Sequence, residues 1–149
     1  MALMPRYVAT VRSPPTPEEA FAFLADLRNF ARWDPGVKSS RQVTGDGPGE
    51  GAEYEVVVTG STLVYRVEEY DPPRSLLAIA VTKRLTSRDL VTVAPDDEGS
   101  TCTYDATLTL NGALRVFEPL MALVVRRVGD KAAGGLAVAL DAEGFERST

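Results

Sequence analysis

The sequence predicts an α+β domain in which a curved antiparallel sheet packs against a long C-terminal helix. From residue 112 to about residue 145, apolar side chains recur with a period near 3.6 and charged side chains lie between them, which is typical of an amphipathic helix. Between residues 37 and 110, short segments of alternating apolar and polar residues are separated by turn residues, which favours an antiparallel meander. Since each pattern leaves one apolar face, we expect the sheet and the helix to cover each other.

The C-terminal helix is expected to dominate the fold. At a rise of about 1.5 Å per residue it would be roughly 50 Å long, so its apolar stripe needs an extensive partner. Pro119 is expected to kink this helix or to mark its true first turn, because proline lacks the backbone donor. Gly134 and Gly135 are expected to let the helix backbone approach the sheet closely.

The first part of the chain predicts one strand and two short helices. Residues 7–11 are typical of a strand. Thr16 is a capping residue, a proline follows it, and Glu19 lies three residues after it, which together indicate a helix start. A second short helix, at about 27–32, is expected to end before Pro35, because the residue before a proline avoids the helical region.

Six strands then follow in a meander, so the predicted order is one strand, two helices, six strands and one helix. Turn residues separate most of them, most clearly the glycine-rich stretch at 45–51. No linker or internal repeat divides the chain, so residues 1–149 are expected to form one domain. The expected strands are residues 37–43, 53–58, 62–70, 75–82, 85–93 and 101–110.

The composition excludes several classes of function. Sixteen basic and twenty-one acidic residues give a net charge of -5, which argues against a nucleic-acid-binding protein. One cysteine and no histidine exclude an intrachain disulfide, a cysteine-based zinc site, a histidine-ligated metal and a histidine-dependent triad. We therefore expect no metal and no cofactor. We also expect no signal peptide, no integral membrane association and, by default, a cytoplasmic protein.

The order of elements and several local motifs resemble a known superfamily. The motifs are Trp-Asp-Pro-Gly-Val at 33–37, Glu-Tyr-Asp-Pro-Pro-Arg at 69–74, and a helix start at 112–127 with its internal proline. They are similar to the START-like, helix-grip superfamily of birch-pollen-allergen-like proteins and bacterial polyketide cyclase/dehydrase-type (SRPBCC) lipid-binding proteins. The resemblance covers nearly the whole chain. It implies a hydrophobic cavity between sheet and helix that holds a lipid, a polyketide or another apolar small molecule.

The apolar side of each strand indicates which residues would line that cavity, with a solid core as the alternative for each of them. Trp33 is expected to cover one end or, alternatively, to anchor the short helices to the sheet. Phe117, Met121 and Val125 are expected to close the cavity from the helix. From the strands, the expected lining residues are Tyr54, Val56, Tyr65, Val67, Leu77, Ile79, Asp89, Val91, Tyr104 and Leu108.

Asp89 is the most informative of these positions. It shares the inward side of its strand with Val91, and a buried carboxylate needs a hydrogen-bonding neighbour such as Tyr104 or an arginine. Facing inward, it would orient a ligand hydroxyl or act as a general acid/base. The alternative is a solvated Asp89 paired with Arg88 or Arg84.

Three functions remain open from the sequence. The first is a binding protein for an apolar small molecule. The second is a cyclase- or dehydratase-like enzyme in which Asp89 serves as acid/base and Tyr54, Tyr65 and Tyr104 donate hydrogen bonds to a carbonyl. The third is an interaction module that binds partner proteins or forms a homodimer through a sheet edge or the helix, because fold alone does not determine function.

Overall fold

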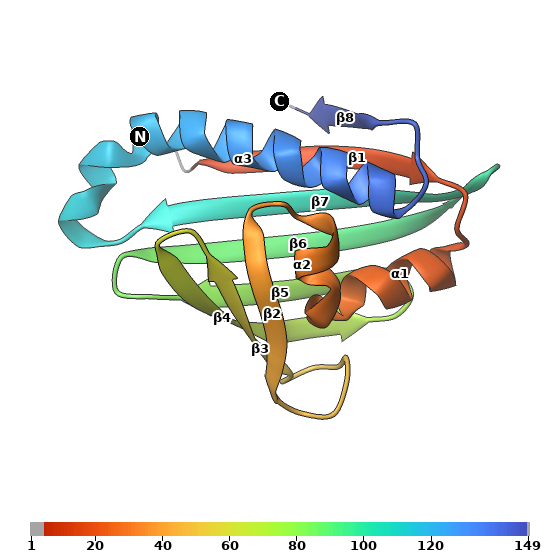
Figure 1. The fold of residues 1–149 in the computed structure, drawn as a ribbon, viewed down its shortest axis with the longest axis horizontal. Coiled ribbons are helices and arrows are strands. Elements are labelled where there is room, and N and C mark those ends of the chain that lie inside the picture. The colour runs from red at the N-terminus through yellow and green to blue at the C-terminus, as the bar shows by residue number, and fades with distance from the viewer. Residues whose placement is uncertain (1–4, 149) are drawn as a thin grey trace.

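A single eight-stranded antiparallel sheet forms the framework of the protein in the computed structural model, which describes residues 5–148. The strand order is β2-β3-β4-β5-β6-β7-β1-β8, and the sheet curves so that its inner face packs against the helices (Figure 1). This confirms the predicted α+β class. The strands are β1 (Arg6–Ser13), β2 (Val37–Thr44), β3 (Glu53–Val58), β4 (Ser61–Asp71), β5 (Ser75–Val81), β6 (Leu85–Asp96), β7 (Gly99–Leu110) and β8 (Phe145–Ser148).

Two short helices and a 3₁₀ turn connect β1 to β2, as the sequence predicts. They are α1 (Pro17–Ala25), η1 (Leu27–Asn29) and α2 (Phe30–Trp33). The capping box at the start of α1 is confirmed. The Glu19 backbone N–H donates to Thr16 Oγ1, and the Thr16 N–H donates to Glu19 Oε1, each at 3.2 Å.

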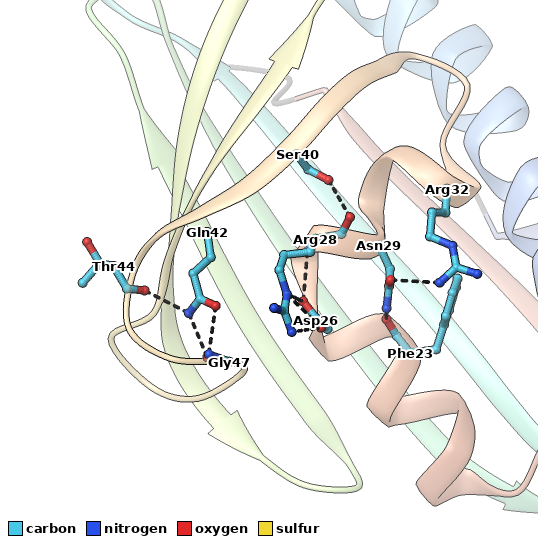
Figure 2. A network of polar contacts seen from close by, with 9 residues as sticks. All are labelled: Phe23, Asp26, Arg28, Asn29, Arg32, Ser40, Gln42, Thr44 and Gly47. Carbon is cyan, nitrogen blue, oxygen red and sulfur yellow. Dashed lines mark hydrogen bonds and ion pairs between the residues drawn. The ribbon is translucent and has the colours of Figure 1, made fainter.

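Polar contacts fix these helices to the edge of the sheet (Figure 2). Asn29 Nδ2 donates to the Phe23 carbonyl at 3.0 Å, which folds η1 back on α1. Ser40 Oγ of β2 donates to the Arg28 carbonyl at 2.9 Å and joins η1 to the edge strand. Through these bonds the chain between α1 and β2 holds Trp33 in the buried core.

The C-terminal helix is shorter than predicted. Residues 112–145 divide into the 3₁₀ turn η2 (Gly112–Phe117), the helix α3 (Glu118–Ala139) and a connection to β8. Pro119 lies in the first turn of α3, the second of its two expected roles. After α3, Asp141 has φ 63° and turns the chain toward β1, where β8 pairs antiparallel. At 22 residues, α3 is about 33 Å long.

The two halves of α3 have different surroundings. The C-terminal half is packed into the core through Ala132, Leu136 and Ala137. The N-terminal half covers the inner face with few buried side chains. The close backbone approach expected from the paired glycines is made by Gly135, but to Trp33 of α2 and not to the sheet. Within residues 5–148, no helix combines the length and apolar character that a membrane span requires.

Candidate functional site

A pocket of about 210 Å³ lies between the inner face of the sheet and α3. Its walls are mostly apolar. The sheet contributes Val56, Leu63 and Leu108, and α3 contributes Met121 and Val125. A group of polar residues lines the same pocket, namely Asp34, Tyr65, Ser87, Asp89 and Tyr104.

Strand pairing brings the polar residues together. On β6 the buried side chains alternate, so Ser87 and Asp89 share the inner face. Asp89 lies opposite Ala106 of β7, which places Tyr104, two residues away on the same strand face, within diagonal reach. Tyr65 of β4 and Ser87 of β6 both pair with Ala80 of β5, so Tyr65 lies two strands away from Ser87.

A chain of hydrogen bonds ends on the Asp89 carboxylate. Tyr104 Oη donates to Asp89 Oδ2 at 2.5 Å, and Ser87 Oγ donates to Asp89 Oδ1 at 3.0 Å. Tyr65 Oη donates to Ser87 Oγ at 2.9 Å. Both carboxylate oxygens are therefore satisfied by neutral donors, and the predicted partnership with Tyr104 is confirmed.

Asp89 is a buried acid without a cation. Its residue is 5% exposed, and among residues 5–148 no arginine or lysine forms an ion pair with it. The alternative of a solvated Asp89 paired with Arg88 or Arg84 is therefore wrong. Burial raises the pKa of Asp89 to about 6, although the hydrogen bonds from Tyr104 and Ser87 oppose this rise. The carboxyl group thus titrates close to neutral pH, a property found in acid/base groups.

Asp34 is a second buried carboxylate at the pocket. It follows α2, is 7% exposed, and accepts a hydrogen bond from the Gly36 N–H at 2.8 Å. Burial raises the pKa of Asp34, while the bond from Gly36 lowers it. The charge of Asp34 also adds to the rise in the pKa of Asp89. Two buried carboxyl groups therefore line one pocket, and the charge of Asp34 disfavours the ionisation of Asp89.

The tyrosines of this cluster remain protonated. Burial and the neighbouring Asp89 carboxylate raise the pKa values of Tyr65 and Tyr104 well above their ordinary value. At neutral pH the hydrogen-bonded cluster around Asp89 consequently presents two phenolic hydroxyls, one serine hydroxyl and a carboxyl group of intermediate acidity. Such a set can donate hydrogen bonds to a carbonyl or accept one from a hydroxyl.

Half of the predicted site residues meet at this pocket. Trp33 and Val91 line a much smaller space of about 20 Å³ beside it, which Asp89 and Tyr104 also border. The Trp33 ring meets the Tyr104 ring edge-on, with 5.5 Å between centroids. The predicted residues that line the larger pocket are Val56, Tyr65, Asp89, Tyr104, Leu108, Met121 and Val125.

The other predicted residues lie elsewhere, which corrects the expected lining. Tyr54 and Val67 are fully buried in the core and do not reach the pocket. Leu77 and Ile79 lie on the opposite face of β5, whose inner face carries Leu76, Ala78 and Ala80. Because the segment from Leu76 to Val81 is apolar throughout, its pattern does not reveal which face is inward.

Phe117 does not close the pocket. It belongs to η2, ahead of the first α-helical residue, and is 54% exposed. The prediction applied α-helical periodicity to residues that form a 3₁₀ turn, so the predicted direction of the Phe117 side chain was wrong. Met121 and Val125, one and two turns later, do cover the pocket.

Sequence reasoning missed several residues at the pocket, among them Ser87, Asp34 and Tyr7. Ser87 shares the side of β6 that Asp89 occupies, which was an available signal. Asp34 was interpreted only as the end of α2. Tyr7, which lines the pocket from β1, shows only the alternation common to all the strands.

A larger hollow of about 810 Å³ lies at the C-terminal end of β1, whereas the smaller pocket lies near the N-terminal end of this strand. It is bordered mainly by charged residues of the β6–β7 hairpin and of the segment at 141–146. Most of its lining residues are exposed, and it contains none of the buried polar cluster. The smaller pocket, with its apolar walls and buried carboxyl group, is the better candidate for a ligand site.

A family model described as "Polyketide cyclase / dehydrase and lipid transport" matches residues 4–141. No curated protein matches the chain. Several solved structures share the fold at low sequence identity. A conserved protein from Geobacillus kaustophilus has a TM-score of 0.69 at 14% identity and covers 97% of this chain and 99% of its own.

Two further structures are aromatase/cyclases. The Zhui aromatase/cyclase from Streptomyces sp. R1128 has a TM-score of 0.72 at 14% identity, with 93% of this chain and 94% of that chain covered. The di-domain ARO/CYC StfQ from the steffimycin biosynthetic pathway has a TM-score of 0.74 at 15% identity. The match includes 94% of this chain and 50% of the StfQ chain. At these identities the similarity establishes the helix-grip fold.

Proposed function

The chain belongs to the polyketide cyclase/dehydrase and lipid transport family, and on that premise we propose that it binds a small apolar molecule with one polar group beneath α3. The observation that supports this proposal is the pocket of about 210 Å³ with apolar walls and a hydrogen-bonded carboxyl group on its sheet side. Ligand pockets typically combine mostly apolar linings with a few polar groups that fix orientation.

The volume limits the size of the ligand. An apolar cavity of about 150 Å³ holds benzene, whereas pockets for drug-sized molecules begin at about 300 Å³. A pocket of about 210 Å³ therefore fits one or two fused rings or a short branched chain. Longer molecules would have to extend past Val124 and Val128, which line the pocket while remaining half exposed.

The polar cluster defines the group that would be recognised. Above pH 6 the Asp89 carboxylate accepts a hydrogen bond from a ligand hydroxyl, and below this pH its protonated form donates to a carbonyl. The hydroxyl oxygens of Tyr104 and Tyr65 can each accept a further hydrogen bond at either pH, because their single hydrogens are donated to Asp89 and Ser87. A phenol, an alcohol or a ketone on an apolar body matches this arrangement.

Binding of 2-naphthol, followed by its fluorescence, tests the proposal. We expect saturable binding that is weaker for naphthalene, which lacks the hydroxyl. Ala106→Phe fills the pocket opposite Asp89 and is expected to abolish binding. The control Ala94→Phe adds the same ring at an exposed position of β6 and should leave binding intact. Equal binding by both variants would show that the probe binds outside the pocket.

Acid/base catalysis on a polyketide-like carbonyl compound is the second candidate function. The observation in its favour is a carboxyl group with a pKa of about 6 at an apolar pocket, next to protonated tyrosines. Positioned acids and bases contribute about 10²–10⁴-fold to rates, so Asp89→Asn should reduce turnover by that order. A variant that retains full turnover of a genuine substrate would remove Asp89 from the mechanism while leaving the binding function standing.

A further inference from the structure

One end of the molecule exposes large apolar side chains among unpaired basic residues. We call this region the α3 tip. Its apolar members are 54% to 75% exposed, and its basic members make no ion pair with any residue that the structure describes. The α3 tip consists of Val116, Phe117, Leu120 and Leu123 together with Lys83, Arg84, Arg115, Arg126 and Arg127.

Backbone contacts hold the two segments of the tip together. The Asn111 N–H, just before η2, donates to the Arg84 carbonyl at 2.8 Å, and Asn111 Nδ2 donates to the Thr82 carbonyl at 2.9 Å. The β5–β6 hairpin therefore lies beside the start of η2, at the end of the molecule where β7 runs into α3 (Figure 1).

The outer face of α3 changes character along its length. At 100° per residue, Leu120, Leu123 and Arg127 lie on one side of the helix, opposite the buried Gly129 and Leu136. The exposed apolar residues therefore occupy the first turns, and the arginines follow one or two turns later. An apolar end with a basic border is the pattern of helices that bind at membrane interfaces.

The charge of the tip is opposite to that of the rest of the chain. Residues 81–86 and 111–128 contain five basic residues and one acid, Glu118, so their net charge is +4. Glu118 is only 4% exposed. Since the whole chain carries -5, all other residues together carry -9. At the far end of the sheet, the β6–β7 hairpin exposes Asp97 and Glu98 (Figure 1).

We propose that the α3 tip docks on an anionic membrane surface. The apolar side chains of η2 and the first turns of α3 would enter the headgroup region, and the five basic residues would contact lipid phosphates. The acidic remainder of the protein would be repelled from the same surface, which orients the molecule. The pocket residues Val124 and Val128 would then lie close to the bilayer.

A second copy of the chain is a poorer occupant of this surface. A symmetric dimer formed through the tip would bring the five basic residues of one protomer against the five of the other. Like charges at an interface are costly, and no acid of the tip is exposed to offset them. Docking on the membrane does not depend on the proposed ligand function, because it rests on the outer face of α3 and not on the polar cluster.

Sedimentation with phosphatidylcholine vesicles, with and without phosphatidylglycerol, tests the proposal. We expect binding only to the anionic vesicles and its loss in high salt. Each basic residue near such a surface contributes about fivefold to binding, so Arg126→Glu/Arg127→Glu should weaken it by more than about 20-fold. The matched control Arg12→Glu/Arg66→Glu makes the same charge change at exposed sites outside the tip and should bind more strongly than the tip variant.

The apolar contribution has its own control. Leu120→Ser/Leu123→Ser should weaken vesicle binding, whereas Val138→Ser/Val43→Ser alters two exposed valines outside the tip and should not. Absence of binding to anionic vesicles would overturn the proposal, and so would equal loss in tip and control variants. A dimer in sedimentation velocity that Leu120→Ser/Leu123→Ser dissociates would also overturn it, because the tip would then be a self-association surface.

Discussion

Gly135 of α3 packs directly on the backbone of Trp33, so that a methyl group at position 135 would overlap the Trp33 carbonyl oxygen. The adjacent Gly134 has open space, since a methyl group at that position would meet no atom closer than Phe145 Cε1, at 3.9 Å. The contact fixes the distance between α3 and α2. It therefore also fixes the separation of the helix that covers the pocket from the residues Trp33 and Asp34 at its edge.

We expect Gly135→Ala and Gly134→Ala to change stability in opposite directions. At position 135 the methyl group forces helix and backbone apart, which should lower the free energy of unfolding by about 3 kcal/mol. At position 134 alanine replaces glycine inside a helix without a clash, which should raise it by up to about 1 kcal/mol. Urea denaturation of both variants measures the difference. Equal effects would show that α3 is not seated on α2 as described.

Asp89 should make the stability of the protein depend on pH between about 4 and 6. Its pKa is about 6 in the folded state, against an ordinary value of 3.8. Between these two pKa values the unfolded state binds fewer protons than the folded state. The Asp89 contribution to the free energy of unfolding therefore falls as pH rises through this range and is constant above pH 6. A difference of about two between the two pKa values corresponds to about 3 kcal/mol. Urea denaturation of wild type and Asp89→Asn across this range measures the contribution.

Asp96 provides the control of opposite sign. A hydrogen bond from Thr101 lowers the pKa of Asp96, so its contribution is present above the ordinary pKa and is lost as pH falls through the lowered one. The difference between wild type and Asp96→Asn should therefore increase with pH only below about pH 4 and stay constant from pH 4 to pH 7, where the Asp89 contribution changes. If wild type and Asp89→Asn differ by a constant amount from pH 4 to pH 7, Asp89 does not titrate as described.

Tyr54→Phe should not destabilise the protein. Tyr54 is fully buried in the core, and its hydroxyl has no hydrogen-bond partner among the described residues. Removing an unsatisfied hydroxyl from the core costs no hydrogen bond and should raise the free energy of unfolding by up to about 1 kcal/mol. Tyr65→Phe is the matched comparison, because Tyr65 Oη donates to Ser87. A loss of stability in Tyr54→Phe comparable to that in Tyr65→Phe would contradict this account.

The sequence predicts those parts of the fold that are specified by local patterns. The alternation that predicts the strand β7 and the motif that predicts the capping box of α1 each span a few residues, and the strand and the cap are both confirmed. The inward position of Asp89 follows from the same alternation in β6. Tyr104 could be named as its partner because paired antiparallel strands bring residues of like parity together.

Features that depend on distant segments could not be predicted. β8 has only four residues and exists through its pairing with β1, more than one hundred residues earlier in the chain. The inner face of β5 is decided by its register with β4 and β6, because its own residues are apolar on both faces. Asp34 reaches the pocket only because α2 is anchored against the sheet. These outcomes depend on packing, which a single segment does not encode.

Asp130 joins three elements, and its replacement should loosen β8 selectively. Tyr7 Oη of β1 donates to Asp130 Oδ1 and Arg147 Nη1 of β8 donates to Oδ2, each at 2.7 Å. The pair with Arg147 is partly exposed, so we expect Asp130→Ala to lower the free energy of unfolding by only about 1 kcal/mol. Because β8 has four residues and pairs only with β1, losing this contact should mainly increase amide hydrogen exchange at 145–148.

Asp105→Ala is the matched control for this prediction. Asp105 of β7 binds Arg6 of β1 through two hydrogen bonds, at 2.8 Å and 3.0 Å, but this pair lies within the continuous β1–β7 ladder. Eight residue pairs hold that ladder together, so removal of one exposed ion pair should leave its exchange unchanged. Faster exchange at 145–148 in Asp130→Ala alone would establish Asp130 as the contact that retains β8. Equal exchange in both variants would show that β8 is held by its backbone pairing without help from α3.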